Sequence, residues 1–175
     1  GGIKVLNPNL TLMDLHNLDT SNITDMSAMF NGGTNLKTIG DISDWDTGKI
    51  TNMHAMFQLA SGLTNIGDLS DWDTSKVTDM SYMFSDCSSL TSLVLSHFNT
   101  PQLLEMVEMF SDCRSLTSLD LSHFDTSQVT DMRSLFYGCS SLTGLNLNNF
   151  DTSQVWDMSY MFDGCSGLIS LDLSH

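Results

Sequence analysis

The sequence predicts an α/β repeat solenoid, a right-handed coil with a parallel sheet on one face and short helices on the other. Three observations support this fold class. A motif recurs every 26 or 27 residues, and each motif contains both an apolar–polar–apolar alternation typical of a strand and apolar residues at the spacing of a helix. Since one coil buries too little apolar surface to be stable alone, neighbouring coils are expected to stack.

The repeat is recognised from a phenylalanine that closes the same dipeptide in each unit. These residues are Phe30, Phe57, Phe84, Phe110, Phe136 and Phe162. Six full repeats begin at Leu10, Leu36, Leu63, Leu90, Leu116 and Leu142, and a truncated seventh begins at Leu168. The solenoid is therefore expected to span residues 10–175. Residues 1–9 lack the pattern and are interpreted as a remnant or a partial cap, so the chain is expected to be an excised fragment of a longer repeat protein.

Each element of the coil is predicted from the fifth repeat. The Leu-Asp-Leu alternation at 119–121 predicts a half-buried strand, and the Asp-Thr-Ser run at 125–127 predicts a turn. Thr130 followed by Asp131 is typical of a helix N-cap and an acidic first turn. The apolar residues at 132, 135 and 136 form the stripe of a short helix, and Gly138 suits the end of that helix.

Charge, hydrophobic run length and the lack of catalytic motifs each argue against a class of function. The 21 acidic and 6 basic residues leave a net charge of −15, which disfavours binding to nucleic acids and to anionic lipids. No apolar run is long enough for a membrane helix. No nucleophile elbow, phosphate loop or metalloprotease motif occurs, so the chain is predicted not to be an enzyme.

The blocks Phe-Asp-Thr-Ser and Val-Thr-Asp-Met-Ser are the most specific part of the repeat, and they occur together at 124–127 and 129–133 with Arg133 in place of the final serine. The pattern over residues 10–175 resembles the 26-residue leucine-rich repeat of surface proteins from Gram-positive bacteria and mycoplasmas. The resemblance implies a secreted, anchored protein of the bacterial cell surface, whose signal peptide and anchor lie outside this sequence. It also implies that the repeats adhere to a host or neighbouring-cell surface.

One cysteine per repeat falls at the same position from the third repeat onward. These are Cys87, Cys113, Cys139 and Cys165. Neighbouring coils would bring their Cα atoms within reach of a disulfide, but stacked side chains pointing the same way have poor geometry for one. A buried ladder of free thiols is the favoured interpretation, with disulfides or a metal as the alternatives.

Two columns of outward residues lie on the strand face, and the first of them is mostly acidic. The first comprises Asp14, Asp41, Asp68, Val94, Asp120, Asn146 and Asp172, and the second Asn17, Asp44, Asp71, His97, His123, Asn149 and His175. We expect no structural role for the first column, so it is a candidate recognition surface. Val94 of the first column and His97 and His123 of the second form a less acidic island on the strand face. No cofactor is predicted, and calcium is a weak alternative because no dedicated calcium loop occurs.

Outward aromatic and apolar residues are the other candidate binding groups. Leu104 and Trp156 replace the threonine that precedes the predicted helices, and Tyr160 follows Trp156 by four residues. Exposed rigid aromatics are frequent in protein and sugar recognition. The resulting hypothesis is a module that binds a host or neighbouring-cell protein or glycan through Asp68, Val94, His97, Asp120, His123, Leu104, Trp156 and Tyr160. A passive stalk and an intracellular interaction scaffold are the alternatives, and the bare ends would also allow end-to-end self-association.

Overall fold

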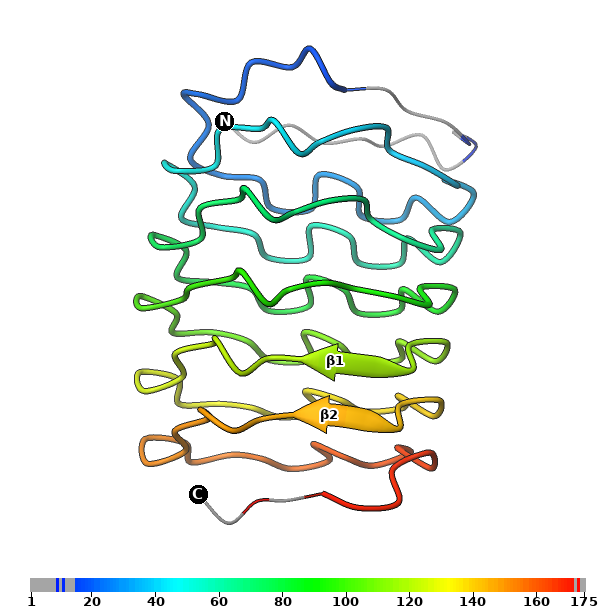
Figure 1. The fold of residues 1–175 in the computed structure, drawn as a ribbon, viewed down its shortest axis with the longest axis vertical. Helices are drawn as coiled ribbons and strands as arrows, with labels where there is room; N and C mark the ends of the chain where they lie inside the picture. The colour runs from blue at the N-terminus through cyan, green and yellow to red at the C-terminus, as the bar shows by residue number, and fades with distance from the viewer. Residues whose placement is uncertain (1–8, 10, 12–14, 172, 174–175) are drawn as a thin grey trace.

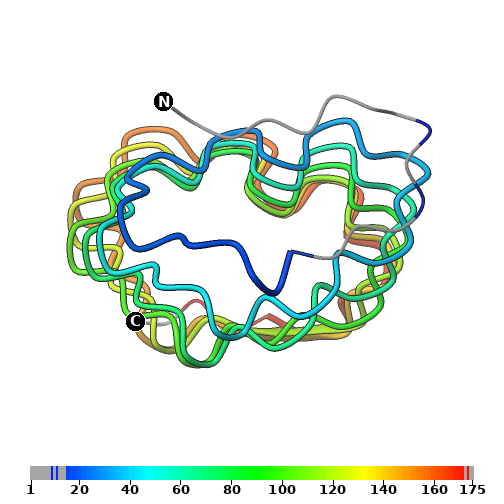
Figure 2. The same cartoon turned by 90° about the horizontal axis from the view of Figure 1, so that it is seen from above.

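The computed structural model describes residues 9, 11, 15–171 and 173. The chain winds into coils stacked along the long axis of the molecule (Figure 1), and seen from above the coils superimpose as a flattened ring (Figure 2). The predicted repeat start at Leu10 lies outside the described residues, as does the remnant at 1–9 except Asn9. The outward positions Asp14, Asp172 and His175 also lie outside them.

The front face of the solenoid carries two strands, β1 (Ser118–Asp120) and β2 (Gly144–Asn146). They pair in parallel, with Leu119 opposite Leu145, so the register equals one repeat. On the opposite face, isolated bridges join neighbouring coils at the same spacing, including Asp79 to Glu105 and Asp131 to Asp157. The strand expected at 119–121 therefore exists as a short strand one residue earlier, but a continuous parallel sheet does not form among the described residues.

The prediction of helices on the opposite face is wrong. No helix occurs in residues 15–171, and the segment expected to be helical, 132–138, is a series of turns. Ser134 and Gly138 have φ angles of 52° and 70°, which a right-handed α-helix does not allow. Turns that bring the chain back every three or four residues bury the same apolar positions as a helix, so the sequence pattern does not distinguish the two.

Hydrogen bonds between coils replace the bonds of a helix. In the segment 132–138 the N–H groups of alternate residues donate to carbonyls of the following coil. The N···O distances from Met132, Ser134, Phe136 and Gly138 are 2.8, 2.9, 3.0 and 2.8 Å. The same series of bonds joins each neighbouring pair of coils on this back face, which we define as residues 24–32, 51–59, 78–86, 104–112, 130–138 and 156–164. At the start of the segment an N–H donates in the opposite direction, as from Thr51 to the Thr24 carbonyl at 2.9 Å. The intervening N–H groups close turns, as from Leu135 to the Met132 carbonyl at 3.3 Å.

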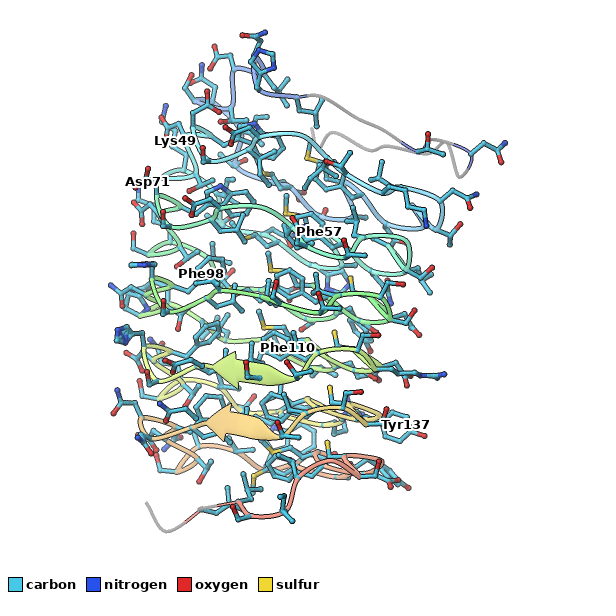
Figure 3. The ribbon with its side chains drawn as sticks, turned by 45° about the vertical axis from the view of Figure 1, so that its right-hand side comes forward. Lys49, Phe57, Asp71, Phe98, Phe110 and Tyr137 are labelled. Carbon is cyan, nitrogen blue, oxygen red and sulfur yellow. The ribbon has the colours of Figure 1, made fainter. Side chains whose placement is uncertain are left out.

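The core is a column of stacked phenylalanines that runs the length of the solenoid. Successive ring centroids from Phe30 to Phe162 lie 5.2, 5.6, 5.8, 5.7 and 5.6 Å apart, with interplanar angles of 12° or less. Phe57 and Phe110 point into the interior in Figure 3, whereas Lys49, Asp71 and Tyr137 point outward. The alignment expected from the repeat is confirmed.

A second column of aromatic rings contains tryptophan in the second and third repeats. Trp45 and Trp72 stand where later repeats have phenylalanine, and their rings stack 6.0 Å apart. Their indole N–H groups donate to the carbonyls of Leu15 at 3.3 Å and Ile42 at 3.0 Å in the preceding coil. The larger side chain is accommodated because its polar nitrogen is paired within the core.

The four cysteines form the expected buried ladder of free thiols. Each thiol donates to the phenylalanine carbonyl of the coil before it, as from Cys113 to Phe84 at 3.2 Å and from Cys139 to Phe110 at 3.0 Å. Burial raises the pKa of Cys87 and Cys139 to about 12. No disulfide links these cysteines.

A buried threonine in the Phe-Asp-Thr-Ser block also joins the coils. The Thr126 hydroxyl donates to the Asp151 carbonyl at 2.9 Å and accepts from the Asp151 N–H at 2.8 Å. Thr100 makes the same pair of bonds to Asp125. Each hydroxyl is fully used although it is buried, which removes the cost of burying a polar group.

Substitution of Gly138 tests how much the left-handed turn on the back face contributes to stability. A β-carbon at this position would clash with the Asp112 side chain, and the positive φ costs an L-residue about 1–2 kcal/mol. We expect Gly138→Ala to lower the free energy of unfolding by about 1–3 kcal/mol, measured by urea denaturation.

Gly144→Ala is the matched control. Gly144 lies in β2, where its β-carbon would meet only the Ser118 β-carbon at 3.5 Å. This variant should match or slightly exceed the parent in stability, because Ala is favoured over Gly in a strand. Equal destabilisation by both variants would contradict the backbone conformation described for the back face.

Thiol labelling tests the cysteine ladder. At pH 8 the native chain should react with iodoacetamide far more slowly than the urea-unfolded chain, because the buried thiols remain protonated. Cys165, at 9% exposed the least covered of the four, should react first. Rapid labelling of Cys113 in the native chain would show that the ladder does not form.

Candidate functional site

The eight predicted site residues lie on two faces of the solenoid, so they do not form one site. Asp68, Val94, His97, Asp120 and His123 line depressions of the front face, and we call them the front-face site. Leu104, Trp156 and Tyr160 belong to the back face. The front-face residues come from three successive coils, starting at Leu63, Leu90 and Leu116.

Three adjoining depressions make up the front-face site. The first, about 470 Å³, lies between residues 93–96 and the strands β1 and β2, and Asp120 lines it. The second, about 450 Å³, is lined by Asp68, Val94 and His97. The third, about 440 Å³, is lined by His97 and His123. Val94 borders the first two and His97 the last two, so the depressions form one continuous surface.

Val94 provides an exposed apolar centre. Its side chain is 67% exposed, whereas its neighbours Leu93 and Leu95 are buried. In the corresponding position of other coils stand Asp68, Asp120 and Asn146. An apolar residue surrounded by polar groups is the arrangement found at the centres of protein interfaces.

The acidic residues of the front face have a structural role that we did not expect. The carboxylate of Asp120 accepts the N–H of Ser122 at 3.0 Å, and that of Asp68 accepts the N–H of Ser70 at 2.9 Å. The side chain and backbone of Ser122 lower the pKa of Asp120, and the backbone and side chain of Ser70 lower the pKa of Asp68. These bonds hold the carboxylates in fixed positions on the surface.

The same two-residue turn recurs in two other columns. In one the acceptors are Asp19, Asp46, Asp73, Asp125 and Asp151. In the other they are Asp25, Asn52, Asp79, Asp131 and Asp157. The net charge of the chain therefore follows in large part from its turns. Exposed acidity alone is a poor indicator of a site here.

Cofactor binding remains untested. Among the described residues no group of three or more histidine, cysteine or acidic side chains is arranged to hold a metal ion. In the same residues no helix is long and apolar enough to cross a membrane. The prediction that the chain needs no cofactor stays a prediction.

The three predicted residues of the back face are also exposed. Trp156 is 71% exposed, Tyr160 67% and Leu104 42%. Tyr160 lines a hollow of about 350 Å³ together with Tyr137, Asp86, Glu108 and Asp112. We did not predict these three acidic residues as site residues. The signal in the sequence was that Asp86 and Asp112 stand where the fifth and sixth repeats have glycine.

Comparison with solved structures identifies the class of fold to which the chain belongs. The chain is similar to a leucine-rich repeat protein from Bacteroides ovatus, with a TM-score of 0.51 and 22% identity over 94% of this chain and 40% of that one. It is also similar to the leucine-rich repeat protein of T. pallidum, with a TM-score of 0.53 and 17% identity over 95% of this chain and 83% of that one. At these identities the likeness shows a leucine-rich-repeat-like solenoid and nothing finer.

The sequence itself gives the family. A model of the family described as Mycoplasma protein of unknown function, DUF285, matches residues 5–118 and again 63–174. The chain belongs to this family. No curated protein matches the sequence. The narrower 26-residue leucine-rich repeat family is not confirmed, and the family description supplies no activity. The chain spans less than half the length of the Bacteroides protein.

Acid unfolding tests the role of the turn carboxylates. The pKa of Asp120 in the folded chain lies below its ordinary value, so its carboxylate stabilises the fold above a pH of about 4, and that contribution is lost as the pH falls through the folded pKa. The melting temperature should therefore fall as the pH is lowered from 5 to 2. Asp120→Asn, whose amide still accepts the Ser122 bond, should show a smaller fall.

Asp120→Ala separates charge from hydrogen bonding. Because it removes the acceptor, it should melt about 2 °C or less below the parent at pH 7, a small effect since the site is exposed. If Asp120→Asn and the parent lose stability equally on acidification, the turn carboxylate does not contribute as described.

Proposed function

We propose that this chain is an interaction module that binds a protein or glycan on the surface of a host or neighbouring cell through the front-face site. The observation that supports the proposal is the continuous surface of three depressions around the exposed Val94. The leucine-rich-repeat-like fold supports the general class of interaction module. The bacterial cell surface as location and adhesion as the role are part of the proposal.

The front-face site has the physical properties of a preorganised interface. Its carboxylates at Asp68 and Asp120 are already held by backbone hydrogen bonds, so little side-chain freedom would be lost on binding. His97 and His123 are both exposed at the same place in adjacent coils. A ligand that spans two coils would meet apolar, acidic and imidazole groups within one surface.

A passive stalk is the second candidate function. The observation that favours it is the unbroken register of the phenylalanine column from Phe30 to Phe162, which makes the solenoid a stiff spacer. A stalk needs no exposed apolar centre. The exposure of Val94 therefore favours the interaction module over the stalk.

A binding array tests the proposal. The chain is applied to immobilised glycans and extracellular-matrix proteins, and the affinity for each positive is compared with that of the double variant Val94→Ser, Asp120→Asn. We expect a loss of at least about tenfold, because an interface centre carries most of the binding energy. Circular dichroism should be unchanged, since Val94 is exposed and the amide introduced at position 120 still accepts the turn hydrogen bond.

Asp125→Asn is the control for the array. Asp125 accepts a turn hydrogen bond like that of Asp120, but it lines none of the three depressions, so affinity should stay within twofold. Equal binding by parent and double variant would remove the front-face site as the binding surface. Absence of any ligand, together with unimpaired spacing of a fused domain, would favour the stalk.

A further inference from the structure

The back face gathers the residue types that dominate protein interfaces. All three tyrosines of the chain lie on it or at its edge, as Tyr82, Tyr137 and Tyr160, together with the exposed Trp156 and the exposed Leu104. Tyrosine and tryptophan are over-represented among the residues that contribute most to binding. This surface is distinct from the front-face site, and the proposed function does not use it.

Two tyrosines frame a hollow that reaches across four coils. Tyr137 and Tyr160 are 40% and 67% exposed, and they line the 350 Å³ hollow together with Asp86, Glu108 and Asp112. Tyr137 points outward at the edge of the molecule in Figure 3. The hollow is therefore lined by tyrosines from the fifth and sixth repeats and by carboxylates from the third and fourth.

The backbone holds several members of this group, among them Glu108 and Tyr160, in an unusual conformation. Glu108 and Tyr160 have φ angles of 53° and 58°, where a non-glycine residue costs about 1–2 kcal/mol. At Glu108 this conformation goes with a bond between coils, from the Glu108 N–H to the Arg133 carbonyl at 3.1 Å. The side chains are thus positioned before any ligand arrives.

The carboxylates of the hollow lack full compensation by the arginines of the chain. Arg114 pairs with Asp112 at 3.1 Å, and Arg133 pairs with Asp131 at 3.0 Å. Burial and then the charge of Asp112 raise the pKa of Asp86. Burial, partly offset by the charge of Arg133, raises the pKa of Glu108. A cation placed in the hollow would offset the cost of desolvation and the mutual repulsion.

We infer that the back face is a second docking surface, and that its partner is a protein segment whose arginine or lysine side chain enters the hollow between Tyr137 and Tyr160. A guanidinium stacks on tyrosine rings and hydrogen-bonds to carboxylates at the same time. The charge of −15 attracts such a segment over long range. A neutral glycan would stack on the tyrosines but leave Asp86 and Glu108 with only the partial compensation that Arg114 and Arg133 provide.

Titration of the full chain with an arginine peptide tests this inference. The probe is the acetylated, amidated heptapeptide Gly-Arg-Gly-Arg-Gly-Arg-Gly, followed by amide chemical shifts of the ¹⁵N-labelled chain at low salt. The largest changes should fall in residues 108–112, 134–138 and 160. The double variant Tyr137→Ala, Tyr160→Ala, which changes no charge, should weaken binding at least about fivefold.

A matched pair of charge variants separates the hollow from general acidity. Asp86→Asn with Glu108→Gln removes two charges from the hollow, and Asp46→Asn with Asp73→Asn removes two from a turn column elsewhere. The first pair should weaken binding at least tenfold and the second less than twofold. If both pairs act equally, or the shifts fall on the front face, the inference is wrong.

A neutral sugar and a folding control complete the experiment. Maltotriose, titrated in place of the peptide, should produce no shifts in the hollow, and comparable or tighter binding by maltotriose would overturn the choice of a basic protein segment. Should the tyrosine variant fail to fold by circular dichroism, the two charge pairs still decide the outcome, since each replacement keeps the size of the side chain.

Discussion

The structure depends on hydrogen bonds that join each coil to the next on the back face. Alternate N–H groups of one coil donate to carbonyls of the following coil three or four times per interface, and one or two N–H groups at the start of the segment donate back to the preceding coil. Each bond contributes only about 0.5–1.5 kcal/mol to stability. Their main effect is to fix the register of one coil on the next. They place Phe over Phe, Cys beside the preceding Phe carbonyl, and Thr hydroxyls against the next turn.

Register was predictable from the sequence, whereas local conformation on the back face was not. The spacing of the phenylalanines predicts the pairing of Leu119 with Leu145 and the aligned column of rings, and both occur. The helices do not occur, because the residues at 132, 135 and 136 are buried equally well by successive turns. Ser134, Tyr160 and Glu108 at positive φ carry no signal in the sequence, since such residues are uncommon there.

The candidate site was predicted in its parts but not in its arrangement. Val94, His97 and His123 stand out by breaking an acidic column, and they do share one surface with Asp68 and Asp120. Leu104, Trp156 and Tyr160 lie on another face, which the expected helices did not reveal. The carboxylates of Asp86 and Glu108 were missed because their importance comes from burial between coils. The acidic residues, in turn, were given too much weight as candidate binding groups, since many aspartates accept hydrogen bonds within turns.

A repeat solenoid with two different faces permits two independent functions. The phenylalanine column runs through six coils and the thiol ladder through the last four, and the outward residues also differ from coil to coil. The apolar centre at Val94 and the tyrosines at 137 and 160 are such differences, and each can vary without disturbing the register.

Scalar coupling through hydrogen bonds tests the register most directly. In a ²H,¹³C,¹⁵N-labelled sample, the amide nitrogen of Phe84 should correlate with the carbonyl carbon of Met109, in the next coil, where the N···O distance is 2.9 Å. A correlation with the carbonyl of Met80 instead, four residues earlier, would show a helix and contradict the account.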